Sequence, residues 1–312
     1  MKFRTEINCD PNTAMISYSD RLEMIGSCFV ENISRKMVES GFQVDVNPFG
    51  IVYNPLSVSS CVRRLLESKD YSSQDVFEEK GIFHSFAHHS RFSGTDRETV
   101  LAGINSRIRH SSDFLQKADW LIITFGTAFV YRLKSTGEVV SNCHKLPSGL
   151  FFHERLQTAA VVSEWNVLIG QLRGMNPALK ILFTVSPIRH WSGGAHENQL
   201  SKSILLLSID EIIRENSACF YFPSYELMLD DLRDYRFYAE DMIHPSSQAV
   251  NYIWEKFSTC YFNKETKAKS AEWEQIQRDL NHQPFHPESD AYRLFRQNTA
   301  EKSKNFLREN RE

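Results

Sequence analysis

The chain has no apolar run long enough to cross a membrane, and its first residues, 1–7, contain Lys2, Arg4 and Glu6 with no apolar region of a signal peptide. We therefore expect no membrane partner and a cytoplasmic location. A dominant charge is missing as well, because 36 basic and 39 acidic side chains leave a formal net charge of −3 with no block of one sign. This near-neutral balance gives no electrostatic reason to bind a nucleic acid, so we expect no nucleic-acid partner.

Closely spaced cysteine pairs and a phosphate-binding glycine turn are also absent. The six cysteines are scattered, with no Cys-x-x-Cys and no short secreted frame, so we expect free thiols rather than disulfides. They are Cys9, Cys28, Cys61, Cys143, Cys219 and Cys260. The first strand-to-helix turn lacks Gly-x-Gly-x-x-Gly, which argues against a nucleotide-binding protein. We expect no cofactor.

What the chain does contain is a series of short apolar runs, each of which ends in a loop. With 312 residues, of which 41% are hydrophobic, it can bury one sizeable core and carry an appendage. Continuous apolar runs are typical of strands covered on both faces of a parallel sheet. The candidates lie at residues 24–25, 42–46, 120–125, 180–185 and 218–222. Their spacing predicts a parallel, doubly wound α/β domain.

Two stretches fall outside this pattern. Residues 54–117, rich in Ser and His, form a long insert between the second and third predicted strands, and we expect it to be helical in parts and to cover or line the site. Beyond residue 262 the composition shifts to Lys, Glu, Gln and Asn, with Trp273 and Ile276 among a few apolar anchors. We predict a helical, charged appendage at residues 263–312, and a flexible tail is the alternative for its last stretch.

The residues just after each strand carry the most information, because ligands of open α/β sheets bind at the carboxyl ends of the strands. The first such turn is Gly26-Ser27-Cys28, which places two candidate nucleophiles between a strand and a helix. The first N–H groups of that helix carry partial positive charge and favour an oxyanion or a thiolate. A structural interpretation also stands, with Ser27 as the N-cap and Cys28 as a small buried side chain.

A second informative turn, Asp241-Met242-Ile243-His244, precedes the last helix of the predicted sheet domain. Residues three apart across one turn allow the carboxylate to bond one imidazole nitrogen and fix its tautomer, while the other nitrogen faces a nucleophile. This is the arrangement of the base and its orienting acid in nucleophilic hydrolases. A helix cap by Asp241 with a surface His244 would explain the same pattern.

Gly26-Ser27-Cys28-Phe29-Val30 resembles the pentapeptide after which the GSCFA family is named, and that family is similar to the SGNH (GDSL-like) hydrolase superfamily. The resemblance covers about residues 1–262, the insert included, with further matching blocks at 47–50, 125–128, 142–145, 186–190 and 221–245. It implies a three-layer α/β/α, SGNH-hydrolase-like fold with five parallel strands. It also implies a site made of a nucleophile, a glycine, a polar group in the third loop and the Asp-x-x-His pair.

The superfamily's first block is Gly-Asp-Ser, and an ungapped match places Cys28 at the nucleophile and Ser27 at the aspartate. Ser27 becomes the nucleophile only with a shift of one residue. We favour Cys28, because a thiol at a helix N-terminus beside an imidazole is expected to have a lowered pKa. The N–H groups of Cys28 and Gly50 would then form the oxyanion hole.

Other polar residues in the strand-end loops complete the expected oxyanion and substrate-binding set. The set is Asn47, Gly50, Gly126, Thr127, Asn142, His144, Arg189 and His190. The superfamily has an Asn in its third block that this chain lacks, so we expect Asn142 or Thr127 to replace it. Arg189 could bind a substrate carboxylate or phosphate, or form a salt bridge at the strand end.

The histidines of the insert raise the question of a metal site. The spacing of His84 and His88, with His89 beside them, would allow two ligands on one helix face. No carboxylate or cysteine lies near them in the sequence at the spacing of a further metal ligand. We therefore interpret them as solvated or lid-lining histidines and expect no metal.

Together these features predict an ester hydrolase that acts on a small-molecule or carbohydrate ester through a covalent acyl intermediate. Cys28 or Ser27 would be the nucleophile, His244 the base and Asp241 the residue that orients it. One alternative is an acyltransferase that uses a thioester donor. The other is a non-catalytic module that binds a carbohydrate or acyl group on the same fold. The oligomeric state is left open.

Overall fold

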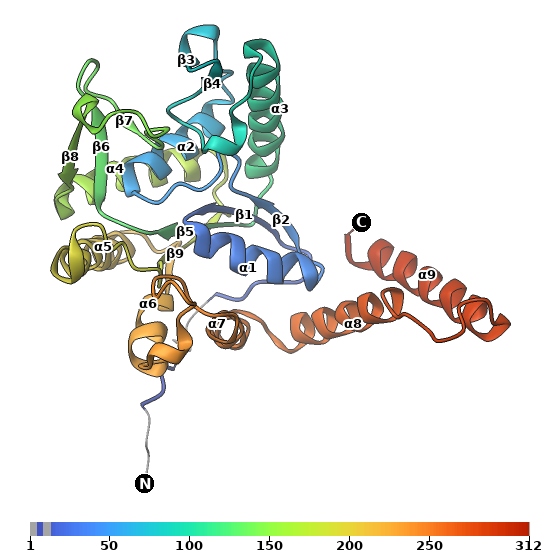
Figure 1. The fold of residues 1–312 in the computed structure, drawn as a ribbon. Helices are drawn as coiled ribbons and strands as arrows, with labels where there is room; N and C mark the ends of the chain where they lie inside the picture. Colours follow the sequence, from blue (N-terminus) through green and yellow to red (C-terminus); the bar gives the residue numbers. More distant parts are fainter. Residues whose placement is uncertain (1–4, 9–13, 312) are drawn as a thin grey trace.

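The computed structural model describes residues 5–8 and 14–311, and its centre is a parallel sheet with helices on both faces (Figure 1). The strand order is β10-β9-β5-β1-β2. These strands are β1 (Arg21–Gly26), β2 (Gln43–Val46), β5 (Trp120–Phe125), β9 (Lys180–Val185) and β10 (Cys219–Phe222). They coincide with the five apolar runs of the sequence, so the predicted α/β fold with five parallel strands is confirmed.

The register of the strands brings their carboxyl ends to one edge of the sheet. Gly26 at the end of β1 pairs with Thr124 of β5, and Thr124 pairs with Thr184 of β9. On the other side of β1, Met24 pairs with Val46, the last residue of β2. The loops that follow these strands therefore begin side by side, as a ligand site of an open α/β sheet requires.

Successive strand residues point into two separate cores, one on each face of the sheet. Ile123 and Phe183 belong to the first core, and Met24 and Ile122 belong to the second. The helices of the first core are α2 (Pro55–Glu67), α3 (Arg97–Gln116), α4 (Thr158–Met175) and α5 (Gly194–Glu215). The helices on the other face are α1 (Cys28–Glu39) and α7 (Ser247–Tyr261). This is the three-layer α/β/α architecture.

The insert at residues 54–117 is helical in parts, as expected, but it also contains an unpredicted hairpin. Besides α2 and α3 it holds β3 (Phe77–Glu79), β4 (Ile82–His84) and the 3-10 turns Ser73–Asp75 and Ser90–Phe92. A small antiparallel sheet after β5 was not predicted either. Its elements are β6 (Phe129–Leu133), β7 (Val139–Val140), β8 (Phe151–Arg155) and the turn Ser148–Leu150. These strands are short and half exposed, so they lack the apolar runs of the central sheet.

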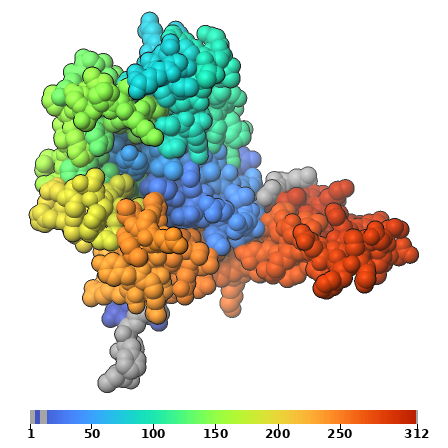
Figure 2. Space-filling model, viewed as in Figure 1, coloured from blue at the N-terminus to red at the C-terminus, as the bar shows by residue number. Residues whose placement is uncertain are grey.

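The C-terminal helices α8 (Lys264–Leu280) and α9 (Asp290–Arg311) project from the rest of the molecule (Figure 2). Trp273 of α8 packs on Phe306 of α9 with ring centroids 5.3 Å apart, and both join the core under α1. At the C-terminal end of α1, Ser40 Oγ donates to Glu274 (2.7 Å). Since Cys28 begins α1, these helices attach at the end of α1 away from the strand-end loops. The proposed domain boundary at residue 262 lies just before α8 and stays a prediction.

A short irregular stretch links β10 to α7. It contains α6 (Ser224–Glu226), a π-helical turn (Leu227–Asp231) and a 3-10 turn (Tyr235–Phe237). π-helical turns are rare and are often found near functional sites. Throughout the described parts of the chain, no helix has the length and apolar character of a membrane span.

One cysteine differs from expectation, because Cys260 is disulfide-bonded. The expectation of free thiols rested on spacing along the chain, whereas pairing depends on which residues the fold brings within about 4.4–6.8 Å between Cα atoms. Cys28, Cys61, Cys143 and Cys219 are free, in agreement with it. Cys9 lies outside the described residues.

Candidate active site

The structure brings Cys28, His244 and Asp241 into one line. Cys28 is the first residue of α1, and the other two lie on the loop that precedes α7. Cys28 Sγ is 4.0 Å from His244 Nε2, and His244 Nδ1 is 2.6 Å from Asp241 Oδ2. Catalytic hydrogen bonds are often long before substrate binds, so the sulfur-to-nitrogen distance suits a nucleophile facing its base.

Asp241 is held in an orientation that fixes the imidazole. Its Oδ1 accepts the backbone N–H groups of Ile243 and His244, both at 2.9 Å. These two N–H groups, His244 first, and then the bond to the imidazole lower the pKa of Asp241 to about 2. An ionised carboxylate can only accept, so Nδ1 carries a proton and Nε2 is the ring nitrogen that faces Cys28.

The two candidate nucleophiles have different environments. Ser27 is 1% exposed, and its Oγ accepts the N–H of Phe29 (3.3 Å) as the N-cap of α1. Cys28 is only partly buried, and its sulfur faces His244. The Ser27 side chain therefore caps the N-terminus of α1, whereas the Cys28 side chain points toward His244.

The expected lowering of the Cys28 pKa is wrong. Burial raises the pKa of the thiol, and the nearby Glu31 carboxylate adds to the rise; the backbone N–H of Cys28 opposes it with a smaller effect. The helix N-terminus thus does not outweigh desolvation of the sulfur. Cys28 would be a neutral thiol at rest and would need His244 to accept its proton.

The turn before Cys28 depends on close approach of β1 to β5. Gly26 has φ +153°, and a Cβ there would lie 2.3 Å from the carbonyl oxygen of Thr124. The Ser27 N–H donates to the same carbonyl (3.3 Å), and Asn47 Oδ1 accepts the Gly26 N–H (2.9 Å). Asn47 is fully buried with φ +44°, so its side chain holds the turn at Gly26 and is not exposed to a substrate.

Gly50 does not supply the predicted oxyanion donor. Its N–H donates to the carbonyl of Asn47 (2.8 Å), and a side chain at this position would clash with His89 at 2.2 Å. The glycine therefore lets the insert approach the second loop, while its N–H closes a turn. Of the predicted donor pair, the Cys28 N–H remains, directed toward its own sulfur.

Gly126 and Thr127 follow β5, but Thr127 does not replace the missing Asn of the third block. Both of their N–H groups donate to the carbonyl of Tyr53, at 2.7 and 3.1 Å. Thr127 Oγ1 is 3.0 Å from Ser201 Oγ of α5, away from the nucleophile. A Cβ on Gly126 would lie 2.8 Å from both His190 Nε2 and Tyr53 Cβ, which is why this position needs glycine.

His190 and Tyr53 lie against each other beside the triad, with ring centroids 5.5 Å apart. Burial, followed by Lys202 and His244, lowers the pKa of His190 to about 3, so its imidazole is neutral. Burial raises the pKa of Tyr53, and Cys143 and Cys28 are close enough to contribute. The sequence argument missed Tyr53, although it follows the second strand within the loop where site residues were sought.

Lys202 is the second residue that the sequence argument missed. It is 1% exposed, and its Nζ donates to the carbonyls of Gly126 (2.6 Å) and Ser186 (2.7 Å), which ties the ends of β5 and β9 together. Burial lowers its pKa to about 7. Its place on the buried stripe of α5 with Leu205 and Ile209 was the available signal, because a lysine on such a stripe needs buried partners.

The remaining predicted residues do not all meet at the triad. Asn142 Oδ1 accepts the His144 N–H (2.8 Å), and the His144 ring is 9% exposed, with its Nε2 2.8 Å from the carbonyl of Ser85. Its ring centroid lies 4.5 Å from that of His84, so His144 belongs to the packing of the insert. Arg189 lies beside the loop of His244 and is described below.

The insert histidines also form no recognisable metal centre among the described residues. Nowhere in residues 5–8 and 14–311 do three or more His, Cys, Asp or Glu side chains gather as metal ligands. His88 is 1% exposed and stacks on Phe49 with centroids 5.0 Å apart. Burial lowers its pKa to about 3, so His88 is a core histidine, and the expectation that it is solvated or lid-lining is wrong.

A model of the GSCFA family matches residues 21–257, most of the chain. The chain belongs to the GSCFA family. A second model, described as GSCFA domain protein, C-terminal domain, matches residues 273–311, which contain the end of α8 and all of α9. No curated protein sequence matches this GSCFA chain.

Several solved structures match this GSCFA protein at low identity. A family 3 carbohydrate esterase from Clostridium thermocellum is 9% identical, with 80% of this chain and 98% of that chain covered and a TM-score of 0.35. A family 3 carbohydrate esterase from Talaromyces cellulolyticus is 8% identical (77% and 95% covered, TM-score 0.34). The acetyl xylan esterase Est2A from Butyrivibrio proteoclasticus is 11% identical (78% and 64% covered, TM-score 0.37). Such low identities and scores say nothing of the reaction.

Proposed function

We propose that this GSCFA protein hydrolyses esters through a thioester intermediate on Cys28. The observation that supports this most is the line from Cys28 Sγ to His244 Nε2 (4.0 Å) and from His244 Nδ1 to Asp241 (2.6 Å). It has the nucleophile, base and orienting carboxylate of a hydrolase triad, in the order that the reaction needs. The substrate class would be a small-molecule or carbohydrate ester.

In the first step, the sulfur of Cys28 attacks the ester carbonyl while His244 Nε2 accepts the thiol proton. Because burial raises the pKa of the thiol, attack and proton transfer are coupled. The carbon-to-oxygen bond then breaks, and the imidazolium returns the proton to the leaving alcohol. Asp241, ionised through its low pKa, stabilises the imidazolium between the two transfers.

In the second step, water attacks the thioester and gives its proton to His244 Nε2. The carboxylic acid leaves, and the sulfur takes the proton back. The developing oxyanion in both steps would be stabilised by the Cys28 N–H at the first turn of α1, where the helix dipole adds partial positive charge. The neutral imidazole of His190, beside Gly126, is a second candidate donor.

The test compares turnover of a simple acetyl ester by the wild type and by Cys28→Ala, Ser27→Ala and Cys143→Ala. Cys143, a partly buried free thiol outside the triad, is the matched control for loss of a sulfur. We expect Cys28→Ala alone to abolish turnover and the acyl adduct seen by mass spectrometry of acid-quenched enzyme. Activity that survives Cys28→Ala, or an adduct on another residue, would contradict the proposal. Transfer to an added alcohol in preference to water would favour the acyltransferase alternative.

A further inference from the structure

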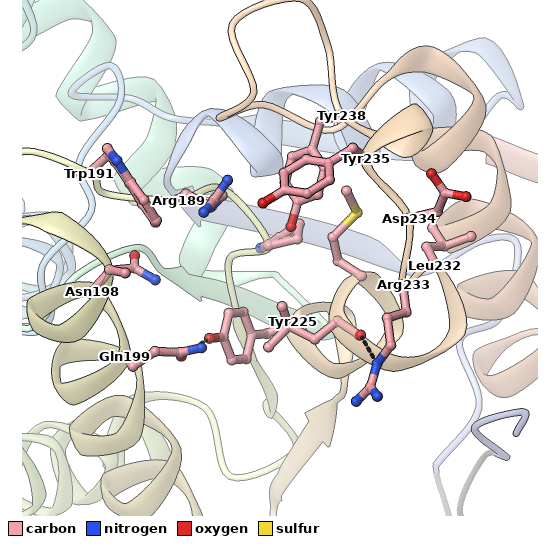
Figure 3. Close-up of a pocket in the computed structure, with 14 residues that line it drawn as sticks. Arg189, Trp191, Asn198, Gln199, Tyr225, Leu232, Arg233, Asp234, Tyr235 and Tyr238 are labelled. Atoms are coloured by element: carbon pink, nitrogen blue, oxygen red, sulfur yellow. Dashed lines mark hydrogen bonds between the residues drawn. The ribbon is translucent and has the colours of Figure 1, made fainter.

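Beside the loop that carries His244 lies a cavity of about 280 Å³ (Figure 3). Its lining comes from the loop after β9, the start of α5 and the stretch between β10 and α7. Typical ligand pockets measure about 300–1,000 Å³, so this one has room for a single ring and its substituents. The triad does not use this cavity.

Arg189 links the cavity to the triad loop. Its backbone N–H donates to the carbonyl of Ile243 (3.2 Å), and its Nη1 donates to the carbonyl of Met242 (3.0 Å). Both carbonyls lie between Asp241 and His244 in the chain. A ligand held by Arg189 would therefore sit next to the proposed base.

The guanidinium of Arg189 is stacked and pre-oriented. Its Cζ lies 3.8 Å from the ring centroid of Trp191 and 5.5 Å from that of Tyr238, and Figure 3 shows it between the two. Stacking on aromatic faces fixes the plane of a guanidinium and leaves its edge for hydrogen bonds. Apart from the bond to Met242, that edge meets no acceptor among the described residues.

Arg189 differs from the other charged side chains of the lining, which are already paired. Arg233 bonds Asp230 (2.8 Å), and Asp234 lies 3.6 Å from Arg236. Within the described chain, Arg189 has no carboxylate at salt-bridge distance. A planar, unpaired guanidinium at the side of a cavity selects an anion, and its fork matches a carboxylate best.

The rest of the lining suits a polar ring. Asn198 Oδ1 accepts the backbone N–H of His190 (2.9 Å), which leaves the Asn198 amide nitrogen free to donate. The Tyr225 hydroxyl donates to Gln199 Oε1, so the Gln199 amide nitrogen is free as well. Trp191, Tyr225 and Tyr238 supply apolar ring faces. Ring faces and amide donors together would accommodate a hydroxylated ring.

We propose that this cavity is a substrate subsite for a sugar-sized ring that carries a carboxylate, with Arg189 as the residue that selects the charge. The proposal rests on the ester hydrolysis proposed above and names its substrate class, an acylated acidic sugar. In it, the carboxylate bonds the Arg189 edge, and the ring lies between the aromatic walls. The acyl group then lies toward Cys28 and His244.

The binding test uses Cys28→Ala protein, which keeps the cavity and cannot turn over. Methyl glucuronide is the probe, methyl glucoside is its neutral match, and acetate is the ringless carboxylate, all measured by NMR titration at low ionic strength. We expect the glucuronide to bind about tenfold or more tightly than the glucoside, which lacks the charge-assisted bonds to Arg189. We expect a similar preference over acetate, which lacks the ring that contacts the aromatic walls. Added Arg189→Gln should remove the preference, and Arg189→Lys should keep part of it.

Arg214→Gln is the charge-matched control, because it removes an exposed arginine at the far end of α5 that is paired with Asp210. It should leave the preference unchanged. Equal affinity for glucuronide and glucoside, or a preference that survives Arg189→Gln, overturns the subsite. Binding of acetate as tightly as glucuronide overturns the role of the ring.

The kinetic test separates the subsite from the reaction. We expect wild-type kcat/KM to be about tenfold or more higher for the acetylated glucuronide than for the acetylated glucoside, and Arg189→Gln to bring this ratio close to one. An equal loss on both esters would mean that Arg189 only holds the triad loop, which overturns selection of charge. If neither ester is hydrolysed but the binding preference stands, the proposed hydrolysis fails while the acidic-ring site survives.

Discussion

The two halves of the candidate site are held in different ways. Cys28 follows a central strand, and its turn is fixed by β5 and by the fully buried Asn47. The side chains of His244 and Asp241 are 45% and 47% exposed, and the hydrogen bonds that orient them lie within their own loop. The position of the nucleophile is therefore part of the fold, whereas the base depends on the geometry of one surface turn.

This difference separates stability from activity. A change in the exposed loop should affect the reaction with little effect on folding, because few buried contacts are lost. A change in the turn before Cys28 should affect both, because the turn lies against the central strands. The four variants below test this contrast, in order of decreasing expected effect.

Asp241→Asn should have the largest effect, and only on activity. The asparagine oxygen can still accept the two backbone N–H groups, but its amide nitrogen would donate to His244 Nδ1 and leave a proton on Nε2, where the base is needed. We expect kcat/KM for a simple ester to fall about 10²- to 10⁴-fold with an unchanged melting temperature. Asp96→Asn, at an exposed N-cap far from the site, is the matched control for both measurements. Wild-type-like turnover would remove Asp241 from the triad.

Lys202→Met should change how stability depends on pH. The native pKa of Lys202 is lowered to about 7, so between pH 7 and about pH 10.4 the unfolded chain binds more protons than the native one. Stability from this group therefore rises with pH across that window and is lowest below it. We expect the difference in free energy of unfolding between the wild type and Lys202→Met to shift in favour of the wild type by a few kcal/mol from pH 7 to pH 10.

Urea unfolding of the wild type and Lys202→Met at several pH values provides the measurement, since the difference between them cancels the other titrating groups. Loss of the bonds to Gly126 and Ser186 lowers the stability of the variant by an amount that does not depend on pH. A difference that stays constant with pH would show that the buried amine keeps its proton throughout.

Gly26→Ala should reduce both stability and activity. The added methyl group would lie 2.3 Å from the Thr124 carbonyl oxygen, so β1 and β5 must move apart at the site. Overpacking of this kind costs about 1–3 kcal/mol of unfolding free energy. Gly103→Ala, in α3 with open space around it, is the control and should be neutral or slightly stabilising. If Gly26→Ala loses stability but keeps full turnover, the turn is less tightly coupled to Cys28 than we argue.

Ser27→Ala should have the smallest effect. It removes the N-cap bond to Phe29, which is worth about 1 kcal/mol, and leaves the sulfur of Cys28 in place. We expect a lower melting temperature and a kcat within a few-fold of the wild type. A complete loss of turnover in folded protein would make Ser27 the nucleophile in place of Cys28.

Sequence reasoning worked best where structure depends on neighbouring residues. The apolar runs 120–125 and 180–185 have the same first and last residues as β5 and β9. Strands buried on both faces are apolar along their whole length, so the run of apolar residues marks both ends of the strand. It failed on β6–β8 and on the hairpin β3–β4, whose short and half-exposed strands depend on their partners for stability. It also failed on Cys260, because a disulfide joins positions that the sequence alone does not relate.

The amino-acid sequence was enough to predict the central strands, an N-cap at Ser27 and the pairing of Asp241 with His244. These depend on periodicity and on hydrogen bonds within one turn. Packing alone shows that Cys28 rather than Ser27 faces His244, that the Cys28 pKa is raised, and that Tyr53 and Lys202 lie beside the site. The burial of a side chain and the direction in which it points depend on residues far apart in the chain, which only folding brings together.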